Sequence, residues 1–381
     1  MKYVLWLSFL ISTAFYITTS VLDPDLWWHI TSGKWILAHH TVPKVDHWTI
    51  YASGKPWIAY SWPHEILYAL TDKYFGIKGL LVLKWILAVL VVFSFFFTFG
   101  KISNNWTFGA LIGAICSAEA SFNFTLRPQS FAWILFAFLL LTVDKINKEG
   151  ANTKLLLALF ALLCFWANTH ITTIFALITI FCILFDPSYY LLSVICTLSG
   201  LAGTFLTPYF GKEWLAFYQH LNAPTSFKII SEFSAANIGQ YDTGVTLIIT
   251  LLAVFLLTIS YKSIKILEAA WGLGLLLLGL YIVKFLPFAA IYLSYLTAKL
   301  WRDVSLIEKG LIEGIKKLIA GIDKIPKEGL SFLLICTAIV NGYKAWQSPL
   351  NTAIVPKDAV DFIIKKQLPH PIIHRFGHGG Y

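Results

Sequence analysis

Acidic and imidazole side chains gather in one short segment near the start of the chain. This segment, "DPDLWWHITSGKW", covers residues 23–35 and directly follows an apolar stretch. Asp23 can cap a helix with Pro24 in its first turn, and that helix would carry Asp25 and His29 on one face. A carboxylate beside an imidazole can take up a proton or hold a divalent cation. This face is therefore the first candidate site.

The same segment also has a purely structural interpretation, in which a well-capped helix lies flat in a membrane interface. Trp27 and Trp28 would hold such a helix at the level of the lipid headgroups. The residues that follow favour more than anchoring, because they add titratable groups between several tryptophans. These groups are His39, His40, Asp46, His47, His64 and Glu65. So many ionisable side chains at one interface favour a functional site.

The composition indicates which class of protein must position these residues. Of the 381 residues, 57% are hydrophobic and 13% are charged, and the mean hydropathy is +0.71. These values are not those of a soluble protein, and they predict an all-α bundle of transmembrane helices. The net charge is +9, but the lysines flank apolar stretches, so membrane orientation explains them better than nucleic acid does. All five cysteines lie within apolar stretches without CxxC spacing, which is typical of small core residues.

Apolar stretches along the chain predict roughly eleven membrane spans, since a span needs about 20 residues and about 17 suffice. Two of them, 154–185 and 267–300, could each be one tilted helix, but the polar residues at 168–170 and Lys284 favour two short helices with a turn. The first stretch is interpreted as a retained helix, because no small-residue cleavage site of a secretory signal follows it. The stretches are 3–22, 79–99, 106–124, 129–143, 154–169, 171–185, 190–207, 243–261, 267–283, 285–300 and 330–346.

Lysines and arginines of the short loops gather on one side of this predicted bundle, which places that side in the cytoplasm. The N-terminus is then inside, and the loops 23–78 and 208–242 face outward together with 347–381, so the C-terminus is outside. We expect one transmembrane domain over 1–346. Within it, segment 303–328 has apolar residues spaced three to four apart among lysines and glutamates, which predicts an amphipathic helix on the cytoplasmic surface. A solvated charged connector is the alternative for this segment.

Several short motifs follow one another in a fixed order along the chain. The first loop has an acidic D-x-D followed by WWH, a glycine, P-x-x-D, and then a tryptophan and an acidic residue that enter an amphipathic helix. The later motifs are "LRPQSF" at 126–131, "WANTH" at 166–170, "TPYFGKEW" at 207–214, "ISEFSAAN" at 230–237, "VKFLPFAA" at 283–290 and "RFGHGGY" at 375–381. In this order they resemble a bacterial family of polytopic membrane proteins related to the GT-C glycosyltransferases. The resemblance spans nearly the whole chain.

Two features depart from this family. The family usually has arginine where this chain has Lys284, which keeps a cation but loses the bidentate geometry toward phosphate. The family's tail also continues well beyond the motif that ends at Tyr381. We therefore expect 347–381 to be the truncated start of an outer soluble domain, with a short helix in "VPKDAVDFIIKK" opened by Pro356.

The resemblance implies sugar transfer from a polyprenyl-phosphate carrier at the outer face of the bacterial plasma (inner) membrane. The acceptor would be an envelope glycan, lipid or protein. Such a reaction needs a general base for the acceptor hydroxyl and cations for the phosphate leaving group. Asp25 is the expected base, and Asp23 is its fallback or partner. His29 would orient Asp25 or share a divalent metal with it, Mg²⁺ or Mn²⁺.

Further residues complete the expected site. Arg127 precedes a proline at the outer end of a predicted span, where it could bind a lipid phosphate or an interior carboxylate, or reach the headgroups without further function. Glu119 lies eight residues earlier in an apolar stretch and could be its buried partner. Lys284 is the second candidate for binding phosphate. The other candidates for substrate recognition are His170, Glu65 and Glu232.

Two other functional classes stay open. A transporter or flippase for a lipid-linked or anionic solute would use Glu119, Arg127 and Lys284 as charges along a pathway. Transporters usually contain internal repeats, and the sequence shows none. A non-catalytic scaffold would use the first loop as a platform and needs no acid in a pocket. Only the glycosyltransferase hypothesis predicts that Asp25, Arg127 and Lys284 converge on one outward cavity.

Overall fold

A computed structural model shows that the chain folds into α-helices joined by short loops and 3₁₀ turns. Among the residues that it describes there is no β-strand, so the predicted all-α class is confirmed for them. The described residues are 2–17, 23–221, 230–237, 239, 241–305, 310–322, 324, 326–350, 356–369 and 372.

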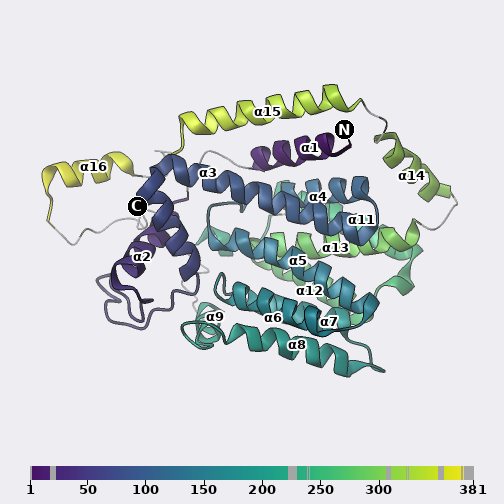
Figure 1. Cartoon of the computed structure of the whole chain (residues 1–381), viewed down its shortest axis with the longest axis horizontal. Helices are drawn as coiled ribbons and strands as arrows, with labels where there is room; N and C mark the ends of the chain where they lie inside the picture. Colours follow the sequence, from purple (N-terminus) through teal and green to yellow (C-terminus); the bar gives the residue numbers. More distant parts are fainter. Residues whose placement is uncertain are drawn as a thin grey trace.

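The longer helices lie side by side and run roughly parallel to one common axis (Figure 1). They are α1 (Lys2–Ile17), α3 (Trp62–Ser103), α4 (Trp106–Ala120), α5 (Pro128–Glu149), α6 (Thr153–Ala167), α7 (Thr173–Leu184), α8 (Tyr190–Thr204), α11 (Tyr241–Ile259), α12 (Ile266–Tyr281), α13 (Leu286–Val304) and α15 (Lys327–Gln347). Helix α13 is the centre of this bundle, because it is buried on almost every side between Leu286 and Trp301 and packs against five others. A helix that is enclosed in this way positions everything attached to its ends.

Short helices occupy the two ends of the bundle. Helices α2 (Leu26–His39), α9 (Glu213–Leu221) and α16 (Lys357–Lys366) lie at one end, which we call the α2 end, and α14 (Gly310–Ile322) lies at the other, the α14 end (Figure 1). The described residues also form three 3₁₀ turns: η1 (Ser231–Phe233) before α11, η2 (Tyr261–Ser263) between α11 and α12, and η3 (Val283–Phe285) between α12 and α13. The loops that carry the candidate site residues lie at the α2 end.

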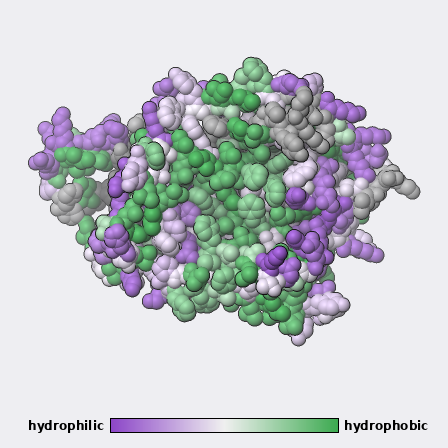
Figure 2. All heavy atoms as spheres, in the orientation of Figure 1, coloured by the Kyte–Doolittle hydropathy of each residue, from purple (hydrophilic) through white to green (hydrophobic). Residues whose placement is uncertain are grey.

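Among the described residues, three helices are long and apolar enough to cross a membrane: α3, α5 and α15. Six further apolar helices in this part of the chain are shorter. Figure 2 shows hydrophobic residues over the middle of the visible face and hydrophilic residues toward both ends of the bundle. This distribution is typical of a protein whose middle lies in hydrocarbon and whose ends lie in water.

Helix α3 is the longest element and bends within its length. Its 42 residues would measure about 63 Å when straight, about twice the hydrocarbon thickness of a bilayer. Gly76 breaks it with φ of 59°, a left-handed conformation that only glycine adopts readily. The first part packs against α2, where a side chain at Gly33 would place its Cβ 1.9 Å from the Glu65 carbonyl oxygen. Glycine at 33 therefore lets the first loop lie tightly on the bundle.

Several predicted element boundaries are confirmed. The stretch 154–185 forms two helices separated at 168–172, and 267–300 forms two helices separated by η3. Within 303–328, α14 buries Ile312 and Ile319 and exposes Leu318, so an amphipathic helix is present there. Helix α16 begins directly after Pro356, as expected. The motif at 375–381 and part of the loop 208–242 lie outside the described residues.

Candidate functional site

Five charged side chains from four segments of the chain meet at the α2 end. The Arg127 Nη2 donates to both carboxylate oxygens of Asp23, at 2.6 and 2.7 Å, and lies 3.1 Å from Asp25 Oδ2. Its Nη1 donates to Glu232 Oε1 at 2.7 Å. Lys284 Nζ lies 3.2 Å from Glu232 Oε2. We call these five residues the charge cluster, and they include the two aspartates and both cations that the sequence indicated.

Each member of the charge cluster is placed by local backbone chemistry. Arg127 stands before Pro128, so its backbone is extended (φ −125°, ψ 157°) and its side chain leaves the start of α5. Lys284 lies in η3 and Glu232 in η1, and the two turns are joined by backbone bonds such as Val283 N–H to Ser234 O at 3.0 Å. The arrangement is therefore held by backbone as well as by charge.

The aspartates differ from their predicted roles at the start of α2. The helix begins at Leu26, so Asp25 rather than Asp23 is the N-cap residue, and its side chain makes no capping bond. The Asp23 carboxylate instead accepts the Asp25 backbone N–H at 2.8 Å and faces Arg127. The prediction that Asp23 caps this helix is therefore met in part: its carboxylate accepts a backbone N–H at the helix entrance, but regular helix begins only at Leu26, after Pro24. The same carboxylate also pairs with the Arg127 guanidinium, since an ionised donor makes a stronger hydrogen bond than a neutral one.

The exposure of the carboxylates separates their possible roles. The Asp23 and Arg127 side chains are 11% and 16% exposed, whereas Asp25 is 57% exposed. Burial opposes ionisation of Glu232, but Lys284 and Arg127 hold the pKa of its carboxyl below the usual range. Burial would likewise lower the pKa of Arg127, yet the three surrounding carboxylates raise it above its usual value. Asp25 is thus the most exposed of the three carboxylates, ahead of Glu232 at 29%, and it lies beside the Arg127 guanidinium.

A second polar group surrounds Glu65, at the first turn of α3. This buried carboxylate accepts the Ser32 hydroxyl at 2.6 Å and the Ser61 hydroxyl at 3.2 Å, and His29 Nδ1 lies at 3.4 Å. The structure therefore pairs His29 with Glu65, although its spacing had suggested Asp25 as its partner. Spacing along one helix could not reveal this partner, because Glu65 comes from the neighbouring helix.

Tyr60 lies within electrostatic reach of both groups and was not singled out from the sequence. Burial, together with the charges of Glu65 and Asp25, raises the pKa of Tyr60 to about 12, although Arg127 opposes the shift. Its ring lies edge-on to His170, with centroids 6.4 Å apart. His170 Nδ1 is 2.9 Å from the Thr172 hydroxyl, in the turn between α6 and α7. Tyr60 therefore carries its proton at neutral pH and joins His170 to the same end of the bundle.

The rest of the first loop is fixed by hydrogen bonds. Burial opposes ionisation of Asp46, but bonds from Thr49 and Trp48 hold its pKa below the usual range. The Tyr209 hydroxyl donates to Pro43 O at 2.7 Å and accepts the Ala59 N–H at 3.0 Å. Asp46 thus stabilises a turn, and Tyr209, which is distant in sequence, links the two ends of residues 43–59 through its hydroxyl.

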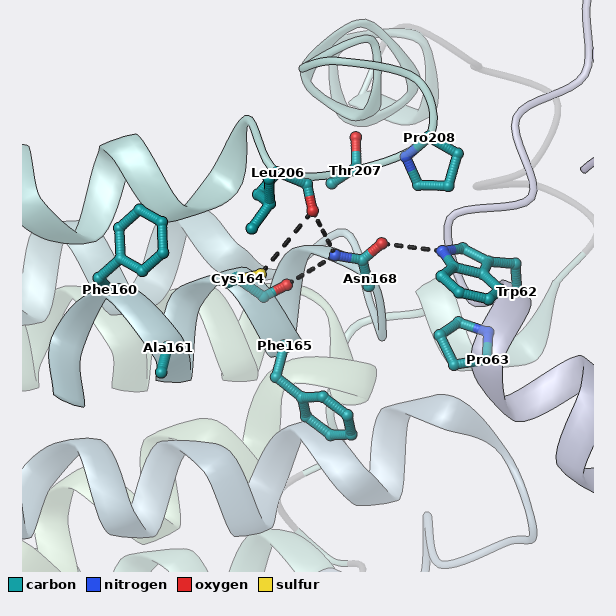
Figure 3. Close-up of a pocket in the computed structure, with 10 residues that line it drawn as sticks. All are labelled: Trp62, Pro63, Phe160, Ala161, Cys164, Phe165, Asn168, Leu206, Thr207 and Pro208. Carbon is teal, nitrogen blue, oxygen red and sulfur yellow. Dashed lines mark hydrogen bonds between the residues drawn. The ribbon is translucent and has the colours of Figure 1, made fainter. Parts of the chain in front are cut away.

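An apolar cavity of about 670 Å³ opens beside the start of α3 (Figure 3). Phe160, Phe165 and Leu206 are among its lining residues, and Trp62 stands at one side. Trp62 Nε1 donates to Asn168 Oδ1 at 2.8 Å, and Asn168 Nδ2 donates to Leu206 O at 3.0 Å. The lining contains no member of the charge cluster. The expected charges therefore converge with one another but do not line this cavity, so the predicted convergence on one cavity is not found here.

The predicted metal site requires the side chains of Asp25 and His29 to face one point. Asp25 faces Arg127 and His29 faces Glu65, so their side chains are engaged with different partners. In the part of the chain that the structure describes, no three His, Cys, Asp or Glu residues are placed to hold one metal ion. Asp25 and His29 therefore do not form a joint donor set for a divalent ion.

Comparison with known proteins adds no family to this geometry. No family model matches the chain, and no curated protein matches it. The site is therefore interpreted from its own contacts.

Proposed function

We propose that this chain is an integral membrane glycosyltransferase of the GT-C type. It would move a sugar from a polyprenyl-phosphate carrier to an envelope acceptor at the outer face of a bacterial plasma membrane. The observation that carries the proposal is the charge cluster, which holds an exposed carboxylate, Asp25, beside Arg127, while Glu232 links Arg127 to Lys284. A base next to a phosphate-binding group is what transfer to a hydroxyl from a phosphate leaving group requires.

The orientation of the bundle supports an outward site. In this proposal the longer helices make roughly eleven spans, with the N-terminus inside and the α2 end outside. Lysines and arginines of the short loops, such as Lys101, Lys148 and Arg302, flank the opposite ends of these helices. A cytoplasmic α14 end agrees with the positive-inside rule. The site would then meet lipid-linked substrates at the outer leaflet.

The chemistry assigns a separate task to each group. The acceptor oxygen attacks the anomeric carbon and loses its proton to Asp25, while the bond between that carbon and the phosphate oxygen breaks. Arg127 and Lys284 would stabilise the charge that develops on the departing phosphate. Asp23 holds the Arg127 guanidinium through both of its oxygens, so its task is positioning. Glu232 does the same for Lys284.

The apolar cavity offers a place for the isoprenoid chain of the carrier. It lies between the start of α3, α6 and the loop after α8 (Figure 3). Its volume of about 670 Å³ is within the range of small-molecule sites. Tyr60, two residues before Trp62, lies within electrostatic reach of Asp25 and Arg127. A chain in the cavity would therefore place its phosphate near the charge cluster.

Sugar transfer in isolated membranes tests the proposal. A panel of radiolabelled polyprenyl-phosphate sugars is incubated with envelope acceptors, with and without Mg²⁺ or Mn²⁺, and transfer is compared between the native chain and Asp25→Asn. Loss of a general base lowers rates by about 10²- to 10⁴-fold, so we expect the variant to lose that much activity. Asp72→Asn is the matched control, because Asp72 pairs with Lys34 at 2.8 Å outside the charge cluster.

The outcomes separate the functional classes. Equal transfer by the native chain and Asp25→Asn, at equal membrane levels, would remove Asp25 from the mechanism. Absence of transfer with every carrier would contradict the glycosyltransferase. In that case, flux of a lipid-linked or anionic solute that is lost in Arg127→Gln would indicate a transporter, and absence of both activities would favour a scaffold.

A further inference from the structure

A second apolar cavity lies on a different face of the bundle, between α3 and α15. It has a volume of about 430 Å³, and its lining includes Phe75, Val82, Leu83 and Ile86 on α3, with Trp346 on α15. Phe75 and Ile86 are exposed beside it. The charge cluster and the first cavity contribute no residue to this lining, so the proposed transfer reaction does not use it.

One cation lies among the residues that line this cavity. Lys78 lines it and holds its Nζ over the Trp346 ring, 4.8 Å from the centroid. The same tryptophan ring lies 6.1 Å from that of Trp85. Lys78 comes two residues after the bend at Gly76, and Trp346 is the last but one residue of α15. Lys78 and Trp346 thus lie toward the α2 end, where tryptophans and lysines of membrane proteins meet the headgroups.

The apolar part of the cavity runs away from Lys78 toward the middle of the bundle. Ile86 follows Lys78 by eight residues on α3, which corresponds to about 12 Å along a helix. Val82 and Leu83 lie between them and line the same cavity. A ligand that fits must therefore carry a negative group at one end and an extended hydrocarbon chain at the other.

We propose that this cavity binds an anionic phospholipid of the leaflet at the α2 end, with its phosphate on Lys78 and one acyl chain along Val82 and Leu83. The charge of Lys78 selects the headgroup, and Trp346 keeps the ammonium at the rim through a cation–π contact. The acyl chain covers the exposed apolar side chains of α3 between Phe75 and Ile86. The site is independent of the proposed transfer reaction.

Lipid binding to the purified full chain tests this inference. Native mass spectrometry counts bound lipids while phosphatidylglycerol or phosphatidylethanolamine is titrated into the micelles. Lys78→Gln removes the charge, and Val82→Trp fills the space for the acyl chain. Lys73→Gln is the matched control, because Lys73 also lies over an aromatic ring, that of Tyr74 at 5.4 Å, but does not line the cavity. Thermal unfolding of each variant checks that the fold is intact.

We expect the native chain and Lys73→Gln to bind one phosphatidylglycerol more tightly than Lys78→Gln by about fivefold, the effect of one lysine near a charged interface. Val82→Trp should lose one bound molecule of either lipid. Soluble glycerol phosphate should not compete, since it has no chain for the cavity. Competition by glycerol phosphate would overturn the lipid as ligand. Equal binding of phosphatidylglycerol by all folded variants would overturn the site itself.

Discussion

Two groups of charged residues, at opposite ends of the bundle, use the same kinds of side chain differently. At the α14 end, Lys299 Nζ donates to both oxygens of Glu268 at 2.8 and 2.7 Å, and the Tyr295 hydroxyl donates to the same carboxylate at 3.0 Å. The Glu268 and Lys299 side chains are 0% and 5% exposed. At the α2 end, three carboxylates share two cations, and Asp25 stays open to its surroundings.

This difference shows how structural and chemical uses of charge can be told apart. The free-energy cost of removing an ion from water is offset only when all of its charge and hydrogen-bonding capacity is met by the protein. The Glu268 carboxylate meets that condition through Lys299 and the Tyr295 hydroxyl. Such a group joins α12 to α13 and has no oxygen to offer a ligand from outside. In the charge cluster the surplus carboxylate is also the exposed one. An accessible carboxylate without a cation of its own favours a ligand-binding or catalytic site over a purely structural ion pair.

The largest expected effect comes from breaking the closed group. Lys299→Met leaves Glu268 as an uncompensated buried charge, which should lower the free energy of unfolding by about 3–5 kcal/mol. Denaturation of the purified protein in detergent measures this change. The double variant Lys299→Met/Glu268→Gln removes both charges and should regain most of the loss. The interpretation fails if the single variant is as stable as the double one.

Arg127→Gln should have a smaller effect, of about 2–3 kcal/mol, because it removes charged hydrogen bonds at a site that water partly reaches. Arg127→Lys keeps the charge but not the two-oxygen contact with Asp23, and we expect it to recover about half of the loss. The same denaturation measurement is used. Arg302→Gln at the α14 end is the matched control, since its partner Asp144 keeps Lys148. If Arg302→Gln lowered the free energy of unfolding more than Arg127→Gln does, the prediction that Arg127 is the main cation holding the charge cluster together would be contradicted.

The smallest effect is a dependence on pH. The pKa of Glu232 is lowered in the folded protein from an ordinary value of 4.5, so its contribution to stability is present above pH 4.5 and is lost as the pH falls through the folded pKa. The stability difference between the native chain and Glu232→Gln should thus be constant from pH 7 to about 5.5 and shrink below pH 4.5. Unfolding curves at several pH values measure this difference. If this stability difference instead grew as the pH fell, the pKa of Glu232 would be raised, not lowered, in the folded protein.

Much of the fold could be predicted because apolar helices are recognisable from the local amino-acid composition alone. The breaks at 168–170 and 283–285 follow from polar residues inside apolar stretches. The bend of α3 was not predicted, since Gly76 looks like any other glycine in the sequence. The helix expected to begin at the tryptophan and acidic residue of the first loop is present from Trp62, and it continues past Gly76 into the stretch that was predicted as a separate span from residue 79.

The members of the site could be predicted better than their partners. Arg127 stood out as a charge beside an apolar stretch, and Asp23 and Asp25 as acids after one. Their mutual contacts join residues about a hundred positions apart, which no local spacing encodes. Tyr60 and Tyr209 gave no signal in a chain with 17 tyrosines, since only their surroundings distinguish them.

The same long separations set an order of events during synthesis. Asp23 and Arg127 are 104 residues apart, and Arg127 and Glu232 are 105 apart. At typical translation speeds, each interval lasts on the order of ten seconds. The two aspartates therefore leave the ribosome long before their first counterion, and Glu232 gains Lys284 only after α12 has been made. A nascent chain that stalls before residue 284 would have most of its helices inserted and its charge cluster still incomplete.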